Sequence, residues 1–164
     1  DVTYFKYKEN PYYICVVMDL FSRKVLSHCV GRSETTYLIK RTIRLAYEER
    51  QPGNDLIFHS DRGAAYKSEA VRKYLGSLKI TQSFSRAYTP YDNAVIENFF
   101  GSLKKEELYR RRYRSERELK ECVKEFITFY NERRPHEKLN YQTPNEVEAA
   151  YIQSIMTEPG GSVC

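Results

Sequence analysis

Short apolar runs separated by polar turns fill the first third of the chain. The runs DVTYFKYK, PYYICVVMDLF and KVLSHCVGR follow one another closely. Their alternation with turns predicts three consecutive antiparallel strands. Residues 14–18 are apolar at every position, which favours a central strand covered on both faces rather than a strand with one wet side. We therefore expect helices on both faces of the sheet.

A helix–strand–helix–strand succession is predicted for the next segment. Apolar residues keep helical spacing over residues 36–50, and Thr35 or Thr36 is the expected cap. The run LIFHSD predicts a fourth strand and the run ITQSFS a fifth. Between them we expect a helix capped by Ser68.

Helices are predicted for most of the second half of the chain. The segment SERELKECVKEFITFYNERR begins with a capping box formed by Ser115 and Glu118. A last helix is expected to begin near Thr143 and Pro144, because proline suits the first helical turn.

The order of these elements indicates an α/β fold. Three strands, then helix, strand, helix, strand and further helices predict a five-stranded mixed sheet with helices on both faces. We expect one domain over residues 1–155 and a flexible tail over residues 156–164.

The helix predicted over residues 90–108 carries two stripes. One stripe is apolar and faces inward. The other consists of Asn93, Glu97, Gly101 and Lys104, so a carboxylate, a missing side chain and an ammonium group share one face. A merely solvated face does not require this combination.

Composition limits the class of protein. The 164 residues are 41% hydrophobic and 30% charged, which fits a soluble protein with one core. No apolar run approaches the roughly 20 residues of a membrane span, so no membrane partner is expected. The four cysteines form no CxxC pair and have no histidine at zinc-ligand spacing. We expect a reduced intracellular protein without structural zinc.

Positive charge is concentrated in one segment. The net charge is +5, and residues 104–120 hold eight basic and four acidic residues. Such a segment attracts a polyphosphate such as DNA. A solvated helix pair with a basic turn explains the same charges equally well.

Two acidic residues occupy positions where chemistry is often found. Asp61 follows the predicted fourth strand in the run FHSDRGAAY, and Glu97 lies 35 intervening residues later on the first turns of a helix. Strand ends of open sheets with helices on their faces gather active-site residues. The spacing alone is weak evidence, because acidic pairs at one fixed offset arise by chance.

At these residues the chain resembles the integrase core of the DDE superfamily, which includes retroviral integrases and transposases of bacterial insertion sequences. The motifs HSDRGAAY and YDNAVIENFFGSLK carry the resemblance, and the opening DVTY, the hairpin VVMDLFSRKVLSH and the stretch YNERRPHEKLNYQTPNEV extend it. The resemblance implies an RNase H-like fold. It also implies that Asp1, Asp61 and Glu97 form an Asp-Asp-Glu triad with divalent metal, and that Lys104 meets DNA near the scissile phosphate.

Asp19 competes with Asp1 for the first position of this triad. The resemblance favours Asp1, because the first acid of the family stands in the first strand in a D-x-T pattern, matched by Asp1 and Thr3. Asp19 and Ser22 are interpreted as a turn at the exit of the second strand, where such side chains bind local backbone.

Converging carboxylates require a counter-charge. Two of them about 4 Å apart repel by about 4 kcal/mol at an effective dielectric constant of about 20. Ligands that are all oxygen suit Mg²⁺ or Mn²⁺ rather than zinc, and two such ions suit phosphodiester displacement. We therefore expect Mg²⁺ or Mn²⁺, as two ions.

Several other side chains are candidates for contact with DNA. These are Asn93, Lys104, Lys105, Arg111 and Arg134. Asn93 is also a candidate for orienting water or for binding its own loop, and Lys104 can equally be a solvated surface lysine. Arg134 and His136 fit the late motif of the family and are candidates for contact with DNA or another subunit; a helix-ending arginine cluster is the alternative. His59 either steadies the Asp61 loop or binds backbone at a strand end.

The leading hypothesis is the catalytic domain of an insertion-sequence transposase, which nicks DNA to give a 3′-hydroxyl and transfers that end to a second phosphodiester. The alternatives are an RNase H-like nuclease or resolvase, and an inactive remnant that only binds DNA. The expected partners are double-stranded DNA and a second copy of the chain, since two DNA ends must be joined. The expected location is the bacterial cytoplasm, in association with the nucleoid.

Overall fold

The computed structural model describes residues 1–53, 55–86 and 93–157. The chain divides into two compact units. The first comprises Asp1–Met18 and Val25–Arg112, and the second comprises Asp19–Lys24 and Tyr113–Cys164. The single domain expected over residues 1–155 stays a prediction, and the two units are described separately.

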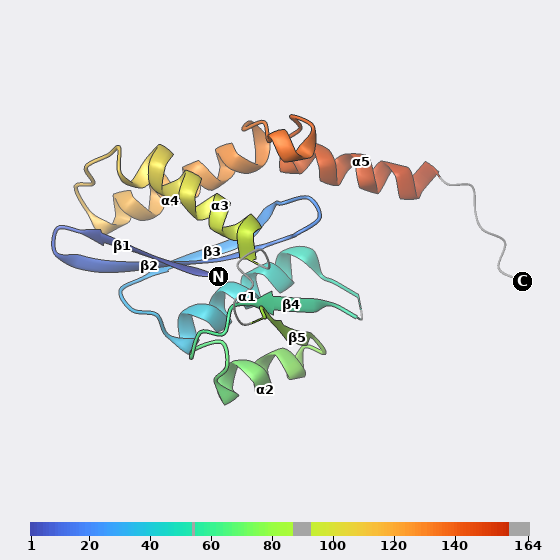
Figure 1. Cartoon of the computed structure of the whole chain (residues 1–164), viewed down its shortest axis with the longest axis horizontal. Coiled ribbons are helices and arrows are strands. Elements are labelled where there is room, and N and C mark those ends of the chain that lie inside the picture. The colour runs from blue at the N-terminus through green and yellow to red at the C-terminus, as the bar shows by residue number, and fades with distance from the viewer. Residues whose placement is uncertain (54, 87–92, 158–164) are drawn as a thin grey trace, which may run out of the picture. The chain divides into compact units, whose positions relative to one another are not determined.

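The first unit opens with an antiparallel sheet of three strands, in the order β1-β2-β3 (Figure 1). These are β1 (Val2–Tyr7), β2 (Asn10–Met18) and β3 (Val25–Gly31). The register places Cys15 of β2 opposite Val2 of β1 and Cys29 of β3. Ile14, Cys15 and Val16 are almost fully buried on alternating faces. The predictions of three antiparallel strands and of a central strand covered on both faces are confirmed.

The fourth and fifth strands form a sheet of their own. They are β4 (Ile57–Ser60) and β5 (Thr81–Phe84), paired in parallel with His59 opposite Ser83. The expected single five-stranded sheet is therefore wrong: the described strands form one sheet of three and one of two. All four residues of β4 pair with β5, and none pairs with a described strand of the other sheet. At its start Ile57 is 65% exposed rather than packed beneath another strand.

Two helices complete the core of this unit. They are α1 (Thr36–Arg50) and α2 (Glu69–Ser77). The Thr35 hydroxyl accepts the Leu38 N–H at 3.2 Å, and the Ser68 hydroxyl accepts the Val71 N–H at 3.3 Å, so both predicted caps are confirmed. Their apolar faces enclose a cluster with one face of the sheet. Its buried members are Cys15, Cys29, Leu38, Ile39, Ile43, Tyr66, Val71, Leu75 and Ile80.

The amphipathic helix expected over residues 90–108 is two elements, and residues 90–92 lie outside the described part. The first is α3 (Ala94–Ser102) and the second is a π-helix, η2 (Leu103–Leu108). The π-helical bond runs from the Tyr109 N–H to the Lys104 carbonyl at 3.0 Å, five residues back. Such wide turns are rare and occur frequently at functional sites.

The second unit contains α4 (Glu116–Glu132), the short 3₁₀ helix η3 (Glu137–Leu139) and α5 (Pro144–Thr157). The capping box at the start of α4 is confirmed: the Ser115 hydroxyl accepts the Glu118 N–H at 3.2 Å, and the Glu118 carboxylate accepts the Arg114 N–H at 2.6 Å. The start of α5 at Pro144 is also as predicted.

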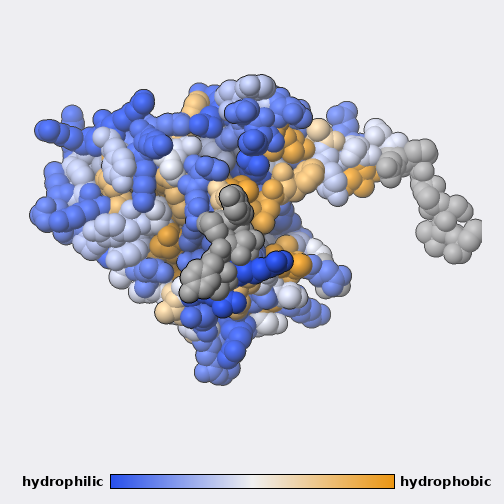
Figure 2. Space-filling view, in the orientation of Figure 1, coloured by the Kyte–Doolittle hydropathy of each residue, from blue (hydrophilic) through white to orange (hydrophobic). Residues whose placement is uncertain are grey.

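Helix α5 runs two residues into the segment expected to be a tail. Met156 and Thr157 are helical, and residues 158–164 lie outside the described part. The last turns of α5 expose apolar side chains, seen as orange atoms along the helix in Figure 2, with Met156 81% exposed. In the parts of the chain that the structure describes, no helix is both long enough and apolar enough to cross a membrane.

Candidate active site

Asp61 lies directly after β4, where the strand becomes a loop. Its Oδ1 accepts a hydrogen bond from the backbone N–H of Gly63 at 2.9 Å. A Cβ atom at position 63 would lie 3.0 Å from the same oxygen, closer than real side chains normally approach. The glycine therefore provides the space that the carboxylate occupies, and the half-buried Asp61 is held in one direction at the exit of the strand.

Asp1 is held by the backbone of β2. Its amino group donates to the Val16 carbonyl at 2.9 Å, and the Val16 N–H donates back to the Asp1 carbonyl at 2.9 Å. The Asp1 carboxylate accepts the Val2 N–H at 2.7 Å. Asp1 thus extends the β1–β2 ladder by one pair and sits at a defined position on the sheet.

Tyr66 lies close to the surroundings of both aspartates. Asp1 pairs with Val16 of β2, which is next to Cys15, and Cys15 Sγ lies 3.9 Å from Tyr66 Oη. Asp61 contributes to the raised pKa of the Tyr66 hydroxyl, after burial and Cys15. Charges act on one another appreciably only at short range in a protein. Asp61 and the β2 residue beside the Asp1–Val16 pair therefore share Tyr66 as a neighbour, although Asp1 and Asp61 are 60 positions apart in the sequence.

A buried thiol and phenol lie beside this pair. Cys15 Sγ and Tyr66 Oη are 3.9 Å apart, and Tyr66 is only 1% exposed. Burial is the main cause that raises the pKa of both groups. Both are therefore neutral at physiological pH and add no charge in this region.

Glu97 lies on α3, in the same compact unit as Asp1 and Asp61, and its side chain is exposed. No group of three or more His, Cys, Asp or Glu side chains within residues 1–53, 55–86 and 93–157 is arranged to hold a metal ion. The triad of Asp1, Asp61 and Glu97 stays a prediction. Asn93 precedes α3, and its side chain makes no capping hydrogen bond to that helix.

Asp19 forms the turn that the sequence indicated. Its carboxylate accepts the Ser22 hydroxyl at 2.6 Å and the backbone N–H groups of Ser22 at 3.2 Å and Phe21 at 3.4 Å. These bonds satisfy the carboxylate locally at the exit of β2, and Asp19 belongs to the other compact unit.

His59 is bound by serine side chains rather than by backbone. Its Nδ1 lies 3.0 Å from Ser83 Oγ, and its Nε2 lies 3.2 Å from Ser85 Oγ. Sequence reasoning missed both serines. The signal that finds them is the parallel register of β4 and β5, which places His59 opposite Ser83.

The basic candidates are in different environments. Lys104 is half-buried in η2 and Lys105 is exposed. The Arg111 guanidinium lies 3.2 Å from the Glu107 carboxylate, so its charge is partly neutralised. Arg134 belongs to the second unit. There, the buried His136 packs edge-on against Tyr130 and its Nε2 contacts the Tyr130 carbonyl at 3.3 Å, which favours a structural role for this histidine.

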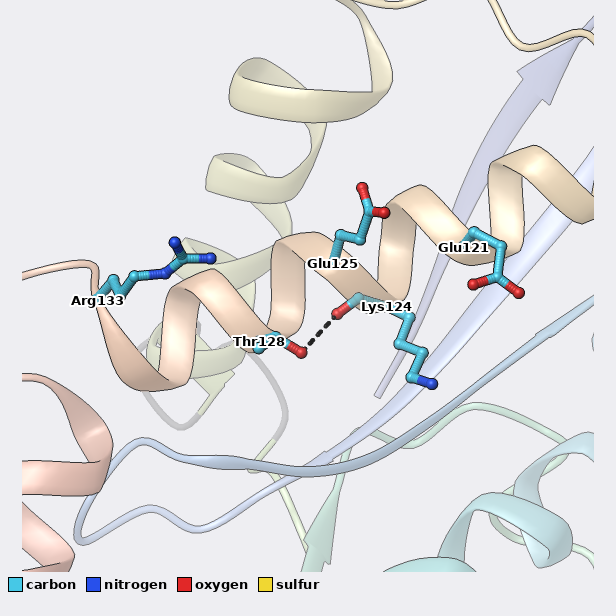
Figure 3. A pocket seen from close by; sticks show the side chains of 5 residues that line it. All are labelled: Glu121, Lys124, Glu125, Thr128 and Arg133. Atoms are coloured by element: carbon cyan, nitrogen blue, oxygen red, sulfur yellow. Dashed lines mark hydrogen bonds between the residues drawn. The ribbon is translucent and has the colours of Figure 1, made fainter.

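A shallow pocket of about 220 Å³ lies on α4, away from these acids in the sequence (Figure 3). Its lining mixes both charges, and the Thr128 hydroxyl is bonded to the Lys124 carbonyl at 3.2 Å. The lining residues are Glu121, Lys124, Glu125, Thr128 and Arg133. We regard it as a solvated outer face, because all of its lining side chains are exposed.

Comparison with known protein families shows to which family this chain belongs. The sequence model of the integrase core domain matches residues 1–90, and a second integrase core domain model matches residues 78–144. The chain belongs to the integrase core domain family. The resemblance inferred from the motifs is thereby confirmed.

Relatives of this integrase core domain are proteins of bacterial insertion sequences. InsK of element IS150 from Escherichia coli strain K12 is 35% identical over 146 residues, which are 89% of this chain and 52% of that protein. The transposase of element IS904 from Lactococcus lactis is 32% identical over 149 residues, covering 90% of this chain and 59% of that protein. The chain therefore spans between half and three-fifths of the length of these relatives.

The fold also matches a solved retroviral structure. The HTLV-2 integrase catalytic core domain, determined in complex with magnesium and in a dimeric form, has a TM-score of 0.69 and 21% identity, with 90% of this chain and 91% of that chain covered. This likeness establishes an α/β fold of the integrase core type.

Proposed function

We propose that this integrase core domain is the catalytic part of an insertion-sequence transposase, which nicks DNA and then transfers the new end to a second site. The observation that carries the proposal is the Asp61 carboxylate at the exit of β4, held by the Gly63 N–H at 2.9 Å, in an integrase core domain whose Asp1 is fixed on the sheet by Val16. The insertion-sequence relatives support the same assignment.

The two aspartates fit a small divalent cation. Mg²⁺ is commonly held by one or two carboxylates while water and substrate phosphate complete its shell. The missing side chain of Gly63 leaves room for the Asp61 carboxylate, and the Gly63 N–H holds it in one direction. Asp1 supplies a second carboxylate oxygen as a ligand. We infer that Asp1 and Asp61 hold Mg²⁺ or Mn²⁺ and that Glu97 joins them from α3. The magnesium complex of the HTLV-2 core supports this choice of metal, and two ions are expected.

The reaction is a pair of phosphodiester displacements. In the first, a water oxygen bonds to phosphorus, the bond from phosphorus to the 3′-oxygen breaks, and the 3′-hydroxyl leaves with a proton. In the second, the oxygen of that 3′-hydroxyl bonds to the phosphorus of another phosphodiester, the bond from that phosphorus to its own 3′-oxygen breaks, and the displaced 3′-oxygen takes up the proton. Divalent cations supply charge neutralisation for the attacking and leaving oxygens in such displacements.

The side chains of this domain have separate roles in that reaction. Asp61 keeps its orientation through the Gly63 N–H, and the buried, neutral Cys15 and Tyr66 add no competing charge. Lys104 and Lys105 are proposed to contact phosphates, and Asn93, Arg111 and Arg134 are proposed as further contacts to DNA. Contacts of this kind position a duplex without reading its sequence.

The active assembly is proposed to hold at least two copies of the chain, since two DNA ends have to be brought together. The dimeric form of the HTLV-2 core supports this view. Double-stranded DNA of the element ends and of the target is the substrate, and the bacterial cytoplasm, at the nucleoid, is the proposed location.

The decisive experiment compares Asp61→Asn, Asp1→Asn and Glu97→Gln with the parent chain, with Asp19→Asn as the matched control. Strand transfer on DNA carrying the terminal repeats and Mn²⁺ binding by calorimetry are measured together. We expect each triad variant to lose activity at least a hundredfold, as expected when charge stabilisation is removed, and Asp19→Asn to keep it. Full activity of Asp61→Asn contradicts the proposal.

The same measurements separate the alternatives. Cleavage of RNA–DNA hybrids without joining of DNA ends indicates an RNase H-like nuclease or resolvase. DNA binding with no heat of Mn²⁺ binding indicates an inactive remnant.

A further inference from the structure

Hydrogen bonds converge on Ser85 at the exit of β5. Its N–H donates to the Ser60 carbonyl at 2.9 Å, and its hydroxyl donates to the same carbonyl at 3.3 Å. Its hydroxyl also lies 3.2 Å from His59 Nε2, and its carbonyl accepts the Arg62 Nε–H at 3.0 Å. One serine therefore contacts His59, Ser60 and Arg62, which lie on either side of Asp61.

These contacts bracket Asp61 on both sides. His59 and Ser60 precede it on β4, and Arg62 follows it, so Ser85 binds the chain before and after the acid. The Ser60 hydroxyl adds a bond to the Asp61 carbonyl at 3.0 Å. Because Asp61 itself is turned by the Gly63 N–H, the backbone on both sides of its Cα has to be fixed for the carboxylate to keep one direction.

The N–H bond of Ser85 to the Ser60 carbonyl continues the parallel ladder, whereas the bonds of its hydroxyl are more than the two-stranded sheet requires. The β4–β5 ladder already pairs four residues of each strand, ending with Ser60 opposite Phe84. Ser83 also binds His59, but through Nδ1 and from a position inside the ladder. Only Ser85, which lies beyond the ladder, reaches past Asp61 to Arg62 among the contacts recorded for the described residues.

We propose that Ser85, together with His59, is a positioning residue that sets the direction of the Asp61 carboxylate for metal binding and phosphodiester chemistry. The inference rests on the proposed function for its catalytic consequence. Its structural part, the fixing of the residues around Asp61, stands independently of that function.

The test uses three serine variants of the chain. Ser85→Ala removes the hydroxyl that binds His59 and the Ser60 carbonyl. Ser85→Thr keeps a hydroxyl at the same position. Ser77→Ala is the matched control, since Ser77 is exposed and its recorded side-chain bond is a local one to the Tyr74 carbonyl at 2.7 Å.

The first readout needs neither metal nor DNA. Hydrogen exchange of the Gly63 amide, which is bonded to Asp61, is expected to speed up severalfold in Ser85→Ala, while Ser85→Thr and Ser77→Ala exchange like the parent chain. An unchanged rate at Gly63 in Ser85→Ala overturns the positioning role, whatever the activity of the chain.

The second readout concerns chemistry. For Ser85→Ala we expect kcat for strand transfer to fall roughly tenfold to a hundredfold and the Mn²⁺ concentration for half-maximal rate to rise severalfold, with KM for DNA unchanged. Ser85→Thr should restore both values. A fall in rate that merely follows the fraction of unfolded chain in urea, or that Ser85→Thr fails to restore, overturns the proposal. Absence of Mn²⁺-dependent strand transfer in the parent chain instead contradicts the proposed function, and leaves the Gly63 exchange result to decide the positioning role.

Discussion

The Asp61 carboxylate and the Gly63 backbone fit each other closely: Oδ1 accepts the Gly63 N–H at 2.9 Å, and a Cβ on Gly63 would lie 3.0 Å from the same oxygen. The hydrogen bond and the missing side chain are two aspects of one arrangement. A carboxylate that turns back onto the N–H two residues later is a common local structure for Asp. Here it fixes a candidate metal ligand at the exit of β4.

Gly63→Ala should therefore impair activity more than stability. The new methyl group would force the Asp61 carboxylate to rotate, and a side-chain rotation costs the fold little. We expect strand transfer to fall at least tenfold, because misplacement of a reacting group by about 1 Å can cost about a hundredfold. Activity assays and thermal unfolding of the same preparation check this prediction.

Gly76→Ala is the matched control for that variant. Gly76 lies in α2, and an added Cβ there meets nothing within 4 Å. Activity equal to that of the parent is expected. If Gly63→Ala keeps full activity, the direction of Asp61 is not important for the reaction.

Much of the local structure could be predicted from the sequence, because it depends on neighbours in the chain. The caps at Thr35, Ser68 and Ser115 each join a side chain to an N–H three residues later. The turn at Asp19 is equally local. Asp61 could be placed at a strand exit because the apolar run before it is short and ends at polar residues.

The features that sequence reasoning missed depend on contacts between distant segments. The separation of β4 and β5 from the three-stranded sheet is decided by which strand edges meet, and this is not encoded in either strand alone. The binding of His59 by Ser83 and Ser85 depends on the register of two parallel strands. The π-helical turn after Ser102 interrupts a segment whose apolar spacing predicted one continuous α-helix.

Gly101 allows a test of whether α3 approaches DNA closely. A Cβ at Gly101 would meet nothing within 4 Å, so packing within the described chain does not require a glycine in this helix. Gly101→Ala should stabilise the domain by about 0.5–1 kcal/mol, because glycine weakens a helix interior. If the backbone of α3 lies against the duplex, the same variant should bind DNA severalfold more weakly. Urea unfolding and fluorescence anisotropy measure the two effects, and unchanged DNA affinity contradicts close approach.

Glu146 makes the start of α5 sensitive to pH. Its carboxylate accepts the Thr143 N–H at 2.7 Å, and the Thr143 hydroxyl accepts the Glu146 N–H at 3.2 Å. The bond from the Thr143 backbone is the main cause that lowers the pKa of Glu146 below its ordinary value of 4.5. Because the folded state holds the proton less tightly than the unfolded state, the stabilisation is present above pH 4.5 and is lost as the pH falls through the lowered pKa.

Glu146→Gln should accordingly unfold more easily than the parent chain at pH 7, and the difference should disappear at pH well below 4.5. Urea unfolding at several pH values, followed by far-ultraviolet circular dichroism, measures it. Thr143→Ala is the companion variant: it removes the hydroxyl part of the cap, which is the second cause of the lowered Glu146 pKa, so its cost of about 1 kcal/mol should be largest above pH 4.5 and only part of it should persist at lower pH. A Glu146→Gln difference that stays constant with pH would show that the carboxylate charge has no part in the cap.

Lys104 and Arg111 should differ in their contribution to DNA binding although both belong to the basic segment. Arg111 is already 3.2 Å from Glu107, whose side chain is 9% exposed, so part of its charge is compensated before DNA arrives. A lysine that contacts a phosphate releases a counterion, and its loss lowers the slope of log affinity against log salt by about 1. We expect Lys104→Ala to show this full change and Arg111→Ala a smaller one, measured by anisotropy between about 50 and 200 mM salt. Equal changes would mean that the Arg111–Glu107 pair opens when DNA binds, and no change for Lys104→Ala would place the half-buried end of η2 outside the DNA contact.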